Sequence, residues 1–400
     1  MLNILHLRLS SVGRGCLMIN KGFYNNFIWL ITLLTLWLLI HTLMINGSPS
    51  YILLNVLLRG IIILAIKTKS LLLFYIFFEA RVIPITIIIF MFGYQPEKIQ
   101  ASLFLLLYTV GGSLPLLIFL IFREIHLCST TIAIPITIAF MVKTPIYRLH
   151  VWLPKAHVEA PVGGSMVLAG VLLKLGSYGL LLFISSIKLN ALMTFYLRMC
   201  LVGSIVCSLV CIRQGDMKIL IAYSSVVHMR VVNLGIVRGT EIGYRCGLMI
   251  AVGHGLCSPF LFLFAFLIYQ YTHSRLLVNN SLACPLMMAL LLGIISINIG
   301  MPPRIRLWSE VIAVIITLNL ISWSWVAFLF IFLLRAAYNL YLYTSCIHTK
   351  FSYFNKAMRR KDIIPLLQML FLGYCTFLSL DLFHICFMII SWHPPQYIPR

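Results

Sequence analysis

Ionisable side chains lie inside strongly apolar stretches of this sequence. Lys143 and Lys174 stand in runs of mostly apolar residues, and Glu79 is nine residues into another such run. A charge at the centre of a bilayer costs roughly 2.5–3.5 kcal/mol or more, so membrane proteins rarely keep one without a use. A lysine can also extend its ammonium to the interface, and this alternative suits Lys143 better because it lies nearer the end of its run. Buried lysine and glutamate can hold and release protons, so these residues are candidates for a proton path.

Further titratable residues extend this set of candidates. Histidine exchanges protons near neutral pH, although a lone histidine is often only a hydrogen-bonded structural group. Glu310 opens a later apolar segment, where a carboxylate also stabilises a helix N-terminus, and Asp381 lies in the last apolar segment. The candidate proton-transfer residues are Glu79, Lys143, Lys174, Glu310, His150, His157, His228 and His254.

Two proline-interrupted segments carry some of these residues. One runs from 129 to 160 and the other from 293 to 315, and each contains an ionisable group. Broken helices leave backbone groups free to hold ions or water, as in transporters built from paired repeats. Proline in an ordinary interfacial loop is the structural alternative. The residues predicted to shape a path are Pro145, Trp152, Pro154, Pro302 and Pro303.

The composition is that of a membrane protein with several spans. Of 400 residues 62% are hydrophobic and 10% are charged, and the mean hydropathy is +1.03; soluble domains are about 45–50% apolar. The net charge of +21 fits basic loops held on one side of a membrane. No basic stripe interleaved with aromatic residues is present, which argues against nucleic-acid binding.

The cysteines point to no metal or cofactor site. Eleven are scattered without a Cys-x-x-Cys motif and without a Cys/His cluster at ligand spacing. Small buried side chains are the simpler interpretation. We therefore predict no metal-ligating and no cofactor-binding residues in this chain, and any redox chemistry would belong to partners.

Apolar segments of about 20 residues, long enough to span a membrane, recur along the chain. They lie near 27–45, 51–66, 70–92, 101–122, 129–148, 162–186, 192–212, 218–237, 246–270, 284–301, 307–323, 325–347 and 364–391. Barrel strands would alternate apolar and polar residues, whereas these segments are apolar on every side. The sequence thus predicts an all-α polytopic bundle of about 12–14 transmembrane helices in a single membrane domain, with 51–66 the weakest span because it is short and contains Arg59.

Several ordered motifs between about residues 70 and 310 resemble one known family. They are FFE at 77–79, GYQPEK at 93–98, KTPIYRLHVWLPKAHVEAP at 143–161, GSMVLAGVLLKLG at 164–176, DMKILIAYSSVVHM at 216–229, GHGLCS at 253–258, and MPP at 301–303 followed by Glu310. Together they resemble the antiporter-like membrane subunits of mitochondrial NADH:ubiquinone oxidoreductase (respiratory complex I), and among these the subunit 4 family.

The resemblance implies two inverted five-helix repeats, each with a broken helix, that form a proton path coupled to quinone reduction in other subunits. The family's central acid of the first half falls on Glu79, and its broken-helix lysine falls on Lys143. The lysine of the next helix falls on Lys174, and the acid of the second half falls on Glu310.

The same resemblance assigns further features. Trp152 and Pro154 match the conductive break, and His228 and His254 match histidines of the second half. It implies divergent N-terminal helices over 1–66, antiporter-like halves over 70–190 and 192–347, and a C-terminal helix over 364–391. The expected setting is the mitochondrial inner membrane, among other complex I membrane subunits and lipid. NADH, FMN, iron–sulfur clusters and ubiquinone are implied for the whole complex and none for this chain.

The sequence departs from the family in having few helices before Glu79 and in carrying arginine at unusual places, including Arg81, Arg148 and Arg230. Arg81 would compete with Lys143 for Glu79. Invertebrate mitochondria read AGA and AGG as serine, so such codons would place serine at these positions. Two other function classes stay open at this point. One is a stand-alone or multi-subunit cation/proton antiporter, and the other is a structural membrane subunit with an inactive path.

Overall fold

The computed structural model describes residues 48–68, 70–121, 137–184, 191–237, 239–277, 285–301, 305–318, 321 and 323–348, together with 28, 31–32, 34–38 and 42 of an earlier helix. The helices are α3 (Pro49–Lys67), α4 (Leu71–Ala80), α5 (Val82–Phe92), α6 (Lys98–Ile121), α8 (Trp152–Glu159), α9 (Val162–Val167), the π-helix η1 (Leu168–Leu172), α10 (Leu173–Ile184), α11 (Ala191–Ile212), α12 (Met217–Val237), α13 (Glu241–Thr272), α14 (Pro285–Ile299), α15 (Ile305–Leu318) and α16 (Ser324–His348). Within these ranges the only strand-like pairing is an isolated bridge between Asp216 and Leu276.

The predicted all-α membrane fold is confirmed. Eight segments of the described residues, each a single helix or a run of adjoining helices, are long and apolar enough to cross a membrane. The segment predicted over 51–66 is the continuous helix α3, which begins with Pro49 in its first turn, where a missing N–H costs nothing. The segment predicted over 364–391 lies outside the described residues, as does most of 27–45.

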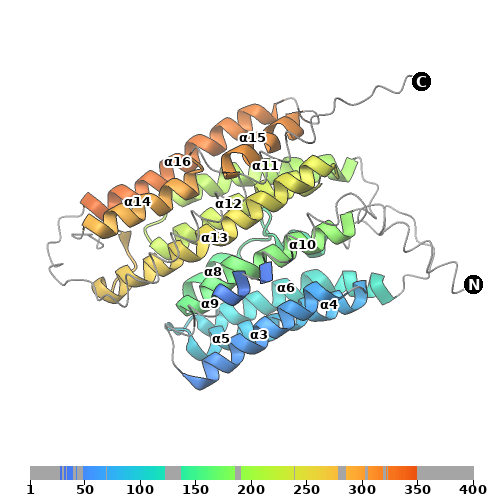
Figure 1. The fold of residues 1–400 in the computed structure, drawn as a ribbon, viewed down its shortest axis with the longest axis horizontal. Helices are drawn as coiled ribbons and strands as arrows, with labels where there is room; N and C mark the ends of the chain where they lie inside the picture. Colours follow the sequence, from blue (N-terminus) through green and yellow to red (C-terminus); the bar gives the residue numbers. More distant parts are fainter. Residues whose placement is uncertain are drawn as a thin grey trace, which may run out of the picture.

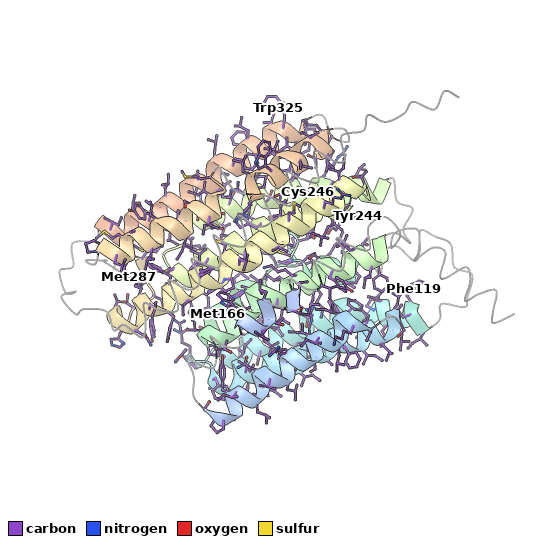
Figure 2. The ribbon with its side chains drawn as sticks, in the orientation of Figure 1. Phe119, Met166, Tyr244, Cys246, Met287 and Trp325 are labelled. Carbon is purple, nitrogen blue, oxygen red and sulfur yellow. The ribbon has the colours of Figure 1, made fainter. Side chains whose placement is uncertain are left out.

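The helices form side-by-side layers around a buried centre (Figure 1). Helices α3 to α6 pack on one side of α8 and α9, while α12 and α13 pack on the other and lead on to α11, α15 and α16. In the most apolar stretch of α12 and of α13, 89% of the residues are buried, whereas in that of α6 only 28% are. Outward apolar side chains such as Trp325 (Figure 2) suit contact with lipid.

One of the predicted spans is interrupted in the structure. The apolar run over 129–148 predicts one span, but its described helical part runs only over 137–143, and residues 144–151 form turns before α8 begins. Pro145 explains this end, because a proline restricts the residue before it to extended conformations and cannot donate a helical hydrogen bond. The break thus follows Lys143 directly.

Glycines allow α12 and α13 to approach each other closely. A Cβ added to Gly235 would lie 3.0 Å from the Gly243 carbonyl oxygen, and one added to Gly247 would lie 3.0 Å from the Val232 carbonyl oxygen. Small residues at such crossings let the backbones of membrane helices touch and gain dispersion energy. This contact holds together the two helices that carry His228 and His254.

We predict that Gly247→Leu destabilises the protein by about 1–3 kcal/mol, because the new side chain must displace a backbone carbonyl. The measurement is the Tm of the purified protein in detergent. Gly111→Leu is the matched control, since a Cβ at this outward-facing glycine meets nothing within 4 Å. Equal Tm values for the two variants would contradict the close-packing account.

Candidate functional site

Glu79 and Lys143 form a buried ion pair. The Lys143 Nζ lies 2.8 Å from the Glu79 Oε2, and the two side chains are 4% and 15% exposed. Glu79 is the last residue but one of α4, next to a kink at Arg81. The helix is interrupted there because Pro84 lacks an N–H and its ring opposes the carbonyl four residues earlier. The ion pair therefore joins a kinked helix to a broken one, and each charge offsets the burial cost of the other.

Arg81 does not take Lys143's place beside Glu79. Its Nε donates to the Phe78 carbonyl at 2.9 Å and its Nη1 to the Leu172 carbonyl at 2.8 Å. The guanidinium also lies 4.1 Å from the centroid of the Phe78 ring. The expected competition for Glu79 is thus resolved in favour of Lys143, while Arg81 is held by backbone oxygens and an aromatic face.

The break after Lys143 is fixed by side chains from neighbouring helices. The Trp152 Nε1 donates to the Val142 carbonyl at 3.1 Å, which satisfies an oxygen that the helix end leaves free. The Asn233 Nδ2 of α12 donates to the Thr144 carbonyl at 3.2 Å and to its hydroxyl at 2.9 Å. Pro154 stands in the first turn of α8, where proline is tolerated. The broken backbone is therefore an ordered structure.

Lys174 lies two residues after the end of the π-helix η1. Its Nζ donates to the Ala169 carbonyl within η1 and lies 2.7 Å from the His254 Nδ1 of α13. A π-helical turn shifts the hydrogen-bond register, and such turns concentrate at functional sites. The ammonium is thus held between a backbone oxygen and a histidine, with 2% of the residue exposed.

A row of polar contacts continues from His254 toward the second half of the chain. The His254 and His228 ring centroids are 5.5 Å apart. The His228 Nε2 lies 2.8 Å from the Arg306 Nη2, and the Arg306 Nε lies 3.1 Å from the Glu310 Oε1. The row therefore runs from Lys174 through two histidines and an arginine to a buried carboxylate.

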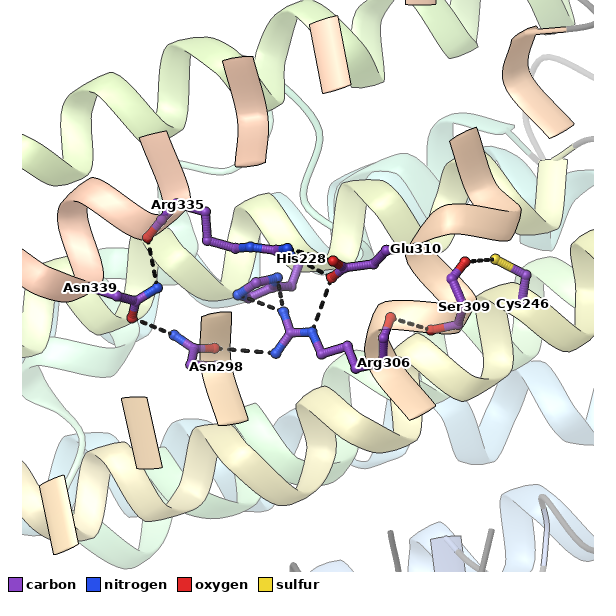
Figure 3. Close-up of polar contacts among 8 residues, drawn as sticks. All are labelled: His228, Cys246, Asn298, Arg306, Ser309, Glu310, Arg335 and Asn339. Atoms are coloured by element: carbon purple, nitrogen blue, oxygen red, sulfur yellow. Dashed lines mark hydrogen bonds and ion pairs between the residues drawn. The ribbon is translucent and has the colours of Figure 1, made fainter. Parts of the chain in front are cut away.

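Glu310 is the most strongly paired acid of the described residues (Figure 3). Both oxygens of its carboxylate accept from the Arg335 guanidinium, and Arg306 binds one of them. Asn298 accepts from the Arg306 Nη1 at 3.3 Å and donates to the Asn339 side chain at 2.9 Å. Bidentate pairing of this kind gives a fixed geometry, so Glu310 is clamped from two helices.

His150 and His157 are not part of this row. The His150 Nε2 faces the Cys207 sulfur at 3.7 Å. His157 stacks on Phe262 with ring centroids 4.6 Å apart, and both of its ring nitrogens are buried without a hydrogen-bond partner. No hydrogen bond among the described residues joins Lys143 to Lys174. The predicted residues thus form one ion pair, one row and two separate histidines.

Pro302, Pro303 and Asp381 lie outside the described residues. Within the described ranges, no three His, Cys, Asp or Glu side chains come together as a metal site.

The chain was compared with known sequences and structures. Residues 68–338 match the family described as "NADH:quinone oxidoreductase/Mrp antiporter, TM". NADH-ubiquinone oxidoreductase chain 4 of Ceratitis capitata is 39% identical over 330 residues, which cover 76% of this chain and 73% of the relative. The chain 4 protein of Mytilus edulis is 35% identical over 380 residues, covering 87% and 86%. The chain belongs to the NADH-ubiquinone oxidoreductase chain 4 family.

A solved structure shares the fold of this chain 4 family member. It is titled "Respiratory complex I from Thermus thermophilus with bound NADH", and the match has a TM-score of 0.77 at 24% identity. The alignment covers 88% of this chain and 79% of that chain. At this identity the likeness concerns the fold alone.

Several residues of the site were not predicted from the sequence of this chain 4 protein. They are Arg306, Arg335, Asn298 and Asn339. Arg335 carries the same signal as Lys174, since it is a cation deep within an apolar helix, and the rule that selected Lys174 selects it too. The two asparagines carry no such signal, because neutral amides are common in membrane helices.

The arginines within the described bundle that bear on the site fall into two groups. Arg306 and Arg335 are paired with Glu310, and Arg81 is hydrogen-bonded to carbonyls. Arg230, by contrast, is fully buried, and although its Nε donates to the Pro145 carbonyl at 3.3 Å, neither of its Nη atoms finds an acceptor. Arg148 has a φ of 71°, which a residue with a Cβ rarely adopts. A buried guanidinium whose two Nη atoms lack acceptors is costly, so Arg230 is the position at which the structure favours the serine hypothesis.

We predict that peptide mass spectrometry of the protein from its natural source finds serine at position 230, because a hydroxyl can bond within its own helix. Peptides across residue 335 are the control and should contain arginine, since Glu310 requires its charge. Arginine at position 230 would contradict the serine hypothesis.

Proposed function

We propose that this chain is the core membrane subunit that translocates protons in NADH:ubiquinone oxidoreductase, across the mitochondrial inner membrane and coupled to electron transfer from NADH to ubiquinone in other subunits. Membership of the chain 4 family supports the assembly and its location. The observation that carries the transport role is the buried row from Lys174 through His254 and His228 to Glu310.

In this proposal the Glu79–Lys143 pair controls one proton. While the pair is closed, the carboxylate stabilises the ammonium and Lys143 keeps its proton. When the carboxylate moves away, the buried amine loses that stabilisation and gives the proton to the next acceptor. Moving one charge against 100 mV requires about 2.3 kcal/mol, and a change of one or two units in a pKa supplies about 1.4 kcal/mol per unit. Opening or closing one ion pair such as Glu79–Lys143 therefore changes the free energy by about as much as moving one proton against the membrane potential requires.

Lys174 and the two histidines carry the proton onward. The Lys174 amine and the His254 Nδ1 are within hydrogen-bond distance, so a proton can pass between them without a large movement. Arg306 and Arg335 keep their protons at all relevant pH values and act through their charge. Their positive field holds Glu310 ionised and sets the energy of a proton that arrives at His228.

His150 and His157 are further proton-transfer candidates, and Pro145, Trp152, Pro154, Pro302 and Pro303 are the residues proposed to shape the path. Pro145, Trp152 and Pro154 are the described residues among those that shape the path, and they lie at the break after Lys143. We further propose that residues 70–190 and 192–347 are the two halves of an inverted repeat, with divergent helices over 1–66 and a last helix over 364–391. Each half supplies one buried acid, Glu79 or Glu310, paired with a cation.

The partners are other membrane subunits of the complex and the lipid bilayer. Exposed apolar side chains along α3, α6 and α16 offer surfaces for both. NADH, FMN, iron–sulfur clusters and ubiquinone belong to the rest of the assembly in this proposal, and this chain binds none of them. A stand-alone or multi-subunit cation/proton antiporter would use the same residues, but the curated relatives described above are oxidoreductase subunits.

We predict that Glu79→Gln in an assembled complex lowers the number of protons pumped per electron at least about twofold, because an amide cannot hold the Lys143 ammonium and then release its proton as the carboxylate does. Lys143→Met should have a similar effect. Proton pumping is measured in vesicles, and electron entry is measured separately with an artificial acceptor that bypasses the membrane part.

Lys155→Met is the matched control for these variants. Its ammonium lies 3.8 Å from the centroid of the Phe104 ring, apart from the row, so the proton yield should stay at the parental value. A parental yield in Glu79→Gln and Lys143→Met complexes would overturn the assigned roles and would favour the structural-subunit alternative.

A further inference from the structure

A second polar cluster lies at the end of the bundle where three loops meet the C-terminal end of α8. The 213–216 and 273–277 loops are joined by hydrogen bonds from the Leu277 N to the Gly215 carbonyl at 2.8 Å and from the Met217 N to the Arg275 carbonyl at 3.1 Å. The 93–97 loop comes so close to α8 that a Cβ on Gly93 would lie 3.1 Å from the Glu159 carbonyl oxygen. These segments lie toward the left in Figure 1.

Lys218 reaches this cluster from the first turn of α12. Its Nζ lies 3.3 Å from the Val158 carbonyl oxygen and 3.4 Å from that of Ala160, and the residue is 7% exposed. These two carbonyls flank Glu159, at a helix end where oxygens lack intrahelical partners and a cation is favourable. Lys218 therefore fixes the backbone on both sides of one acid.

Glu159 is buried and incompletely satisfied. The residue is 2% exposed, and its Oε2 has no hydrogen-bond partner, whereas the backbone of Gln95 faces the carboxylate. Arg275, Glu97 and Lys218 are the charged groups that act on it. Glu159 precedes the span that begins at Val162, and burial raises the pKa of its carboxyl, against the opposing charges of Arg275 and Lys218. A carboxyl so placed can bind a proton that reaches it from the loop side.

His157 is subject to the charges of both this cluster and Lys174. It shares α8 with Glu159, and it is fully buried against Phe262 with both ring nitrogens free of partners. The charges of Lys218 and of Lys174 both act on its ring. His157 is therefore placed where a proton from the loop side can approach the lysine that begins the central row.

We propose that Glu159 and Lys218 form the site at which this chain exchanges protons with the water on the side of these loops, with His157 as the link to Lys174. This inference rests on the proposed function. A hydronium ion gives its proton to the Glu159 carboxylate and leaves as water. The neutral carboxyl passes the proton through intervening water to a nitrogen of His157, and the imidazolium passes it to the Lys174 amine. Each step moves one proton and restores the previous donor, and Lys218 positions Glu159 throughout.

The test compares two isosteric variants in the assembled complex. Glu159→Gln should lower the proton yield per electron at least about twofold and should remove one titration step from the pH profile of pumping. Glu97→Gln changes an exposed acid of the adjoining loop. Its proton yield should remain parental and its titration step should persist, moved to lower pH because the charge of Glu97 raises the pKa of Glu159. Lys218→Met should shift the pH profile of pumping. Lys218→Arg should restore the parental profile, since a guanidinium can also donate to the Val158 and Ala160 carbonyls.

The outcomes separate this site from the proposed function. If Glu159→Gln pumps like the parent while Glu79→Gln is impaired, the exchange site is overturned and the proposed function stands. If neither variant is impaired, the proposed function itself fails. If the Glu159→Gln complex does not assemble, Glu159→Asp decides: a shifted pH profile with retained pumping supports the site, and an unshifted profile overturns it.

Discussion

An ionised side chain inside a membrane needs a partner, and this requirement shapes the whole described structure. Removing one member of a buried ion pair costs about 3–5 kcal/mol, so each buried charge must be placed opposite another charge or a free dipole. Glu79 has Lys143, and Glu310 has Arg306 and Arg335. A helical bundle can supply such partners only where its helices deviate from regular geometry or meet closely.

Irregular backbone provides the remaining partners. The π-helix η1 offers the Ala169 carbonyl to Lys174, and the Leu172 carbonyl accepts from Arg81. The break after Lys143 is held by Trp152, while the end of α8 is held by Lys218. The same features that make the charges tolerable leave them close to exchangeable neighbours. Stability and proton transfer therefore depend on the same atoms, and few of these positions can change for one purpose without affecting the other.

Much of the fold could be predicted from the sequence, because the apolar segments are long and their connections are short. The depth of Glu79 and Lys174 in those segments also identified them as unusual. Their partners could not be predicted, since pairing depends on how helices cross: Arg81 is nearer to Glu79 in sequence, yet Lys143 takes that place. Arg335 was not among the predicted site residues, although it too is a cation deep inside an apolar segment. The break near Pro145 was visible, but the π-helix before Lys174 has no sequence signature in this chain.

The central claim is that Lys174 passes protons between the two halves of the chain. The most direct measurement is the number of protons pumped per electron by an assembled complex with Lys174→Met, with electron entry measured in the same preparation. Lys174 touches no acid, and its contacts are a carbonyl and His254, so methionine leaves no buried charge unpaired. The account predicts a yield at least about twofold lower with electron entry unchanged. A parental yield would contradict it.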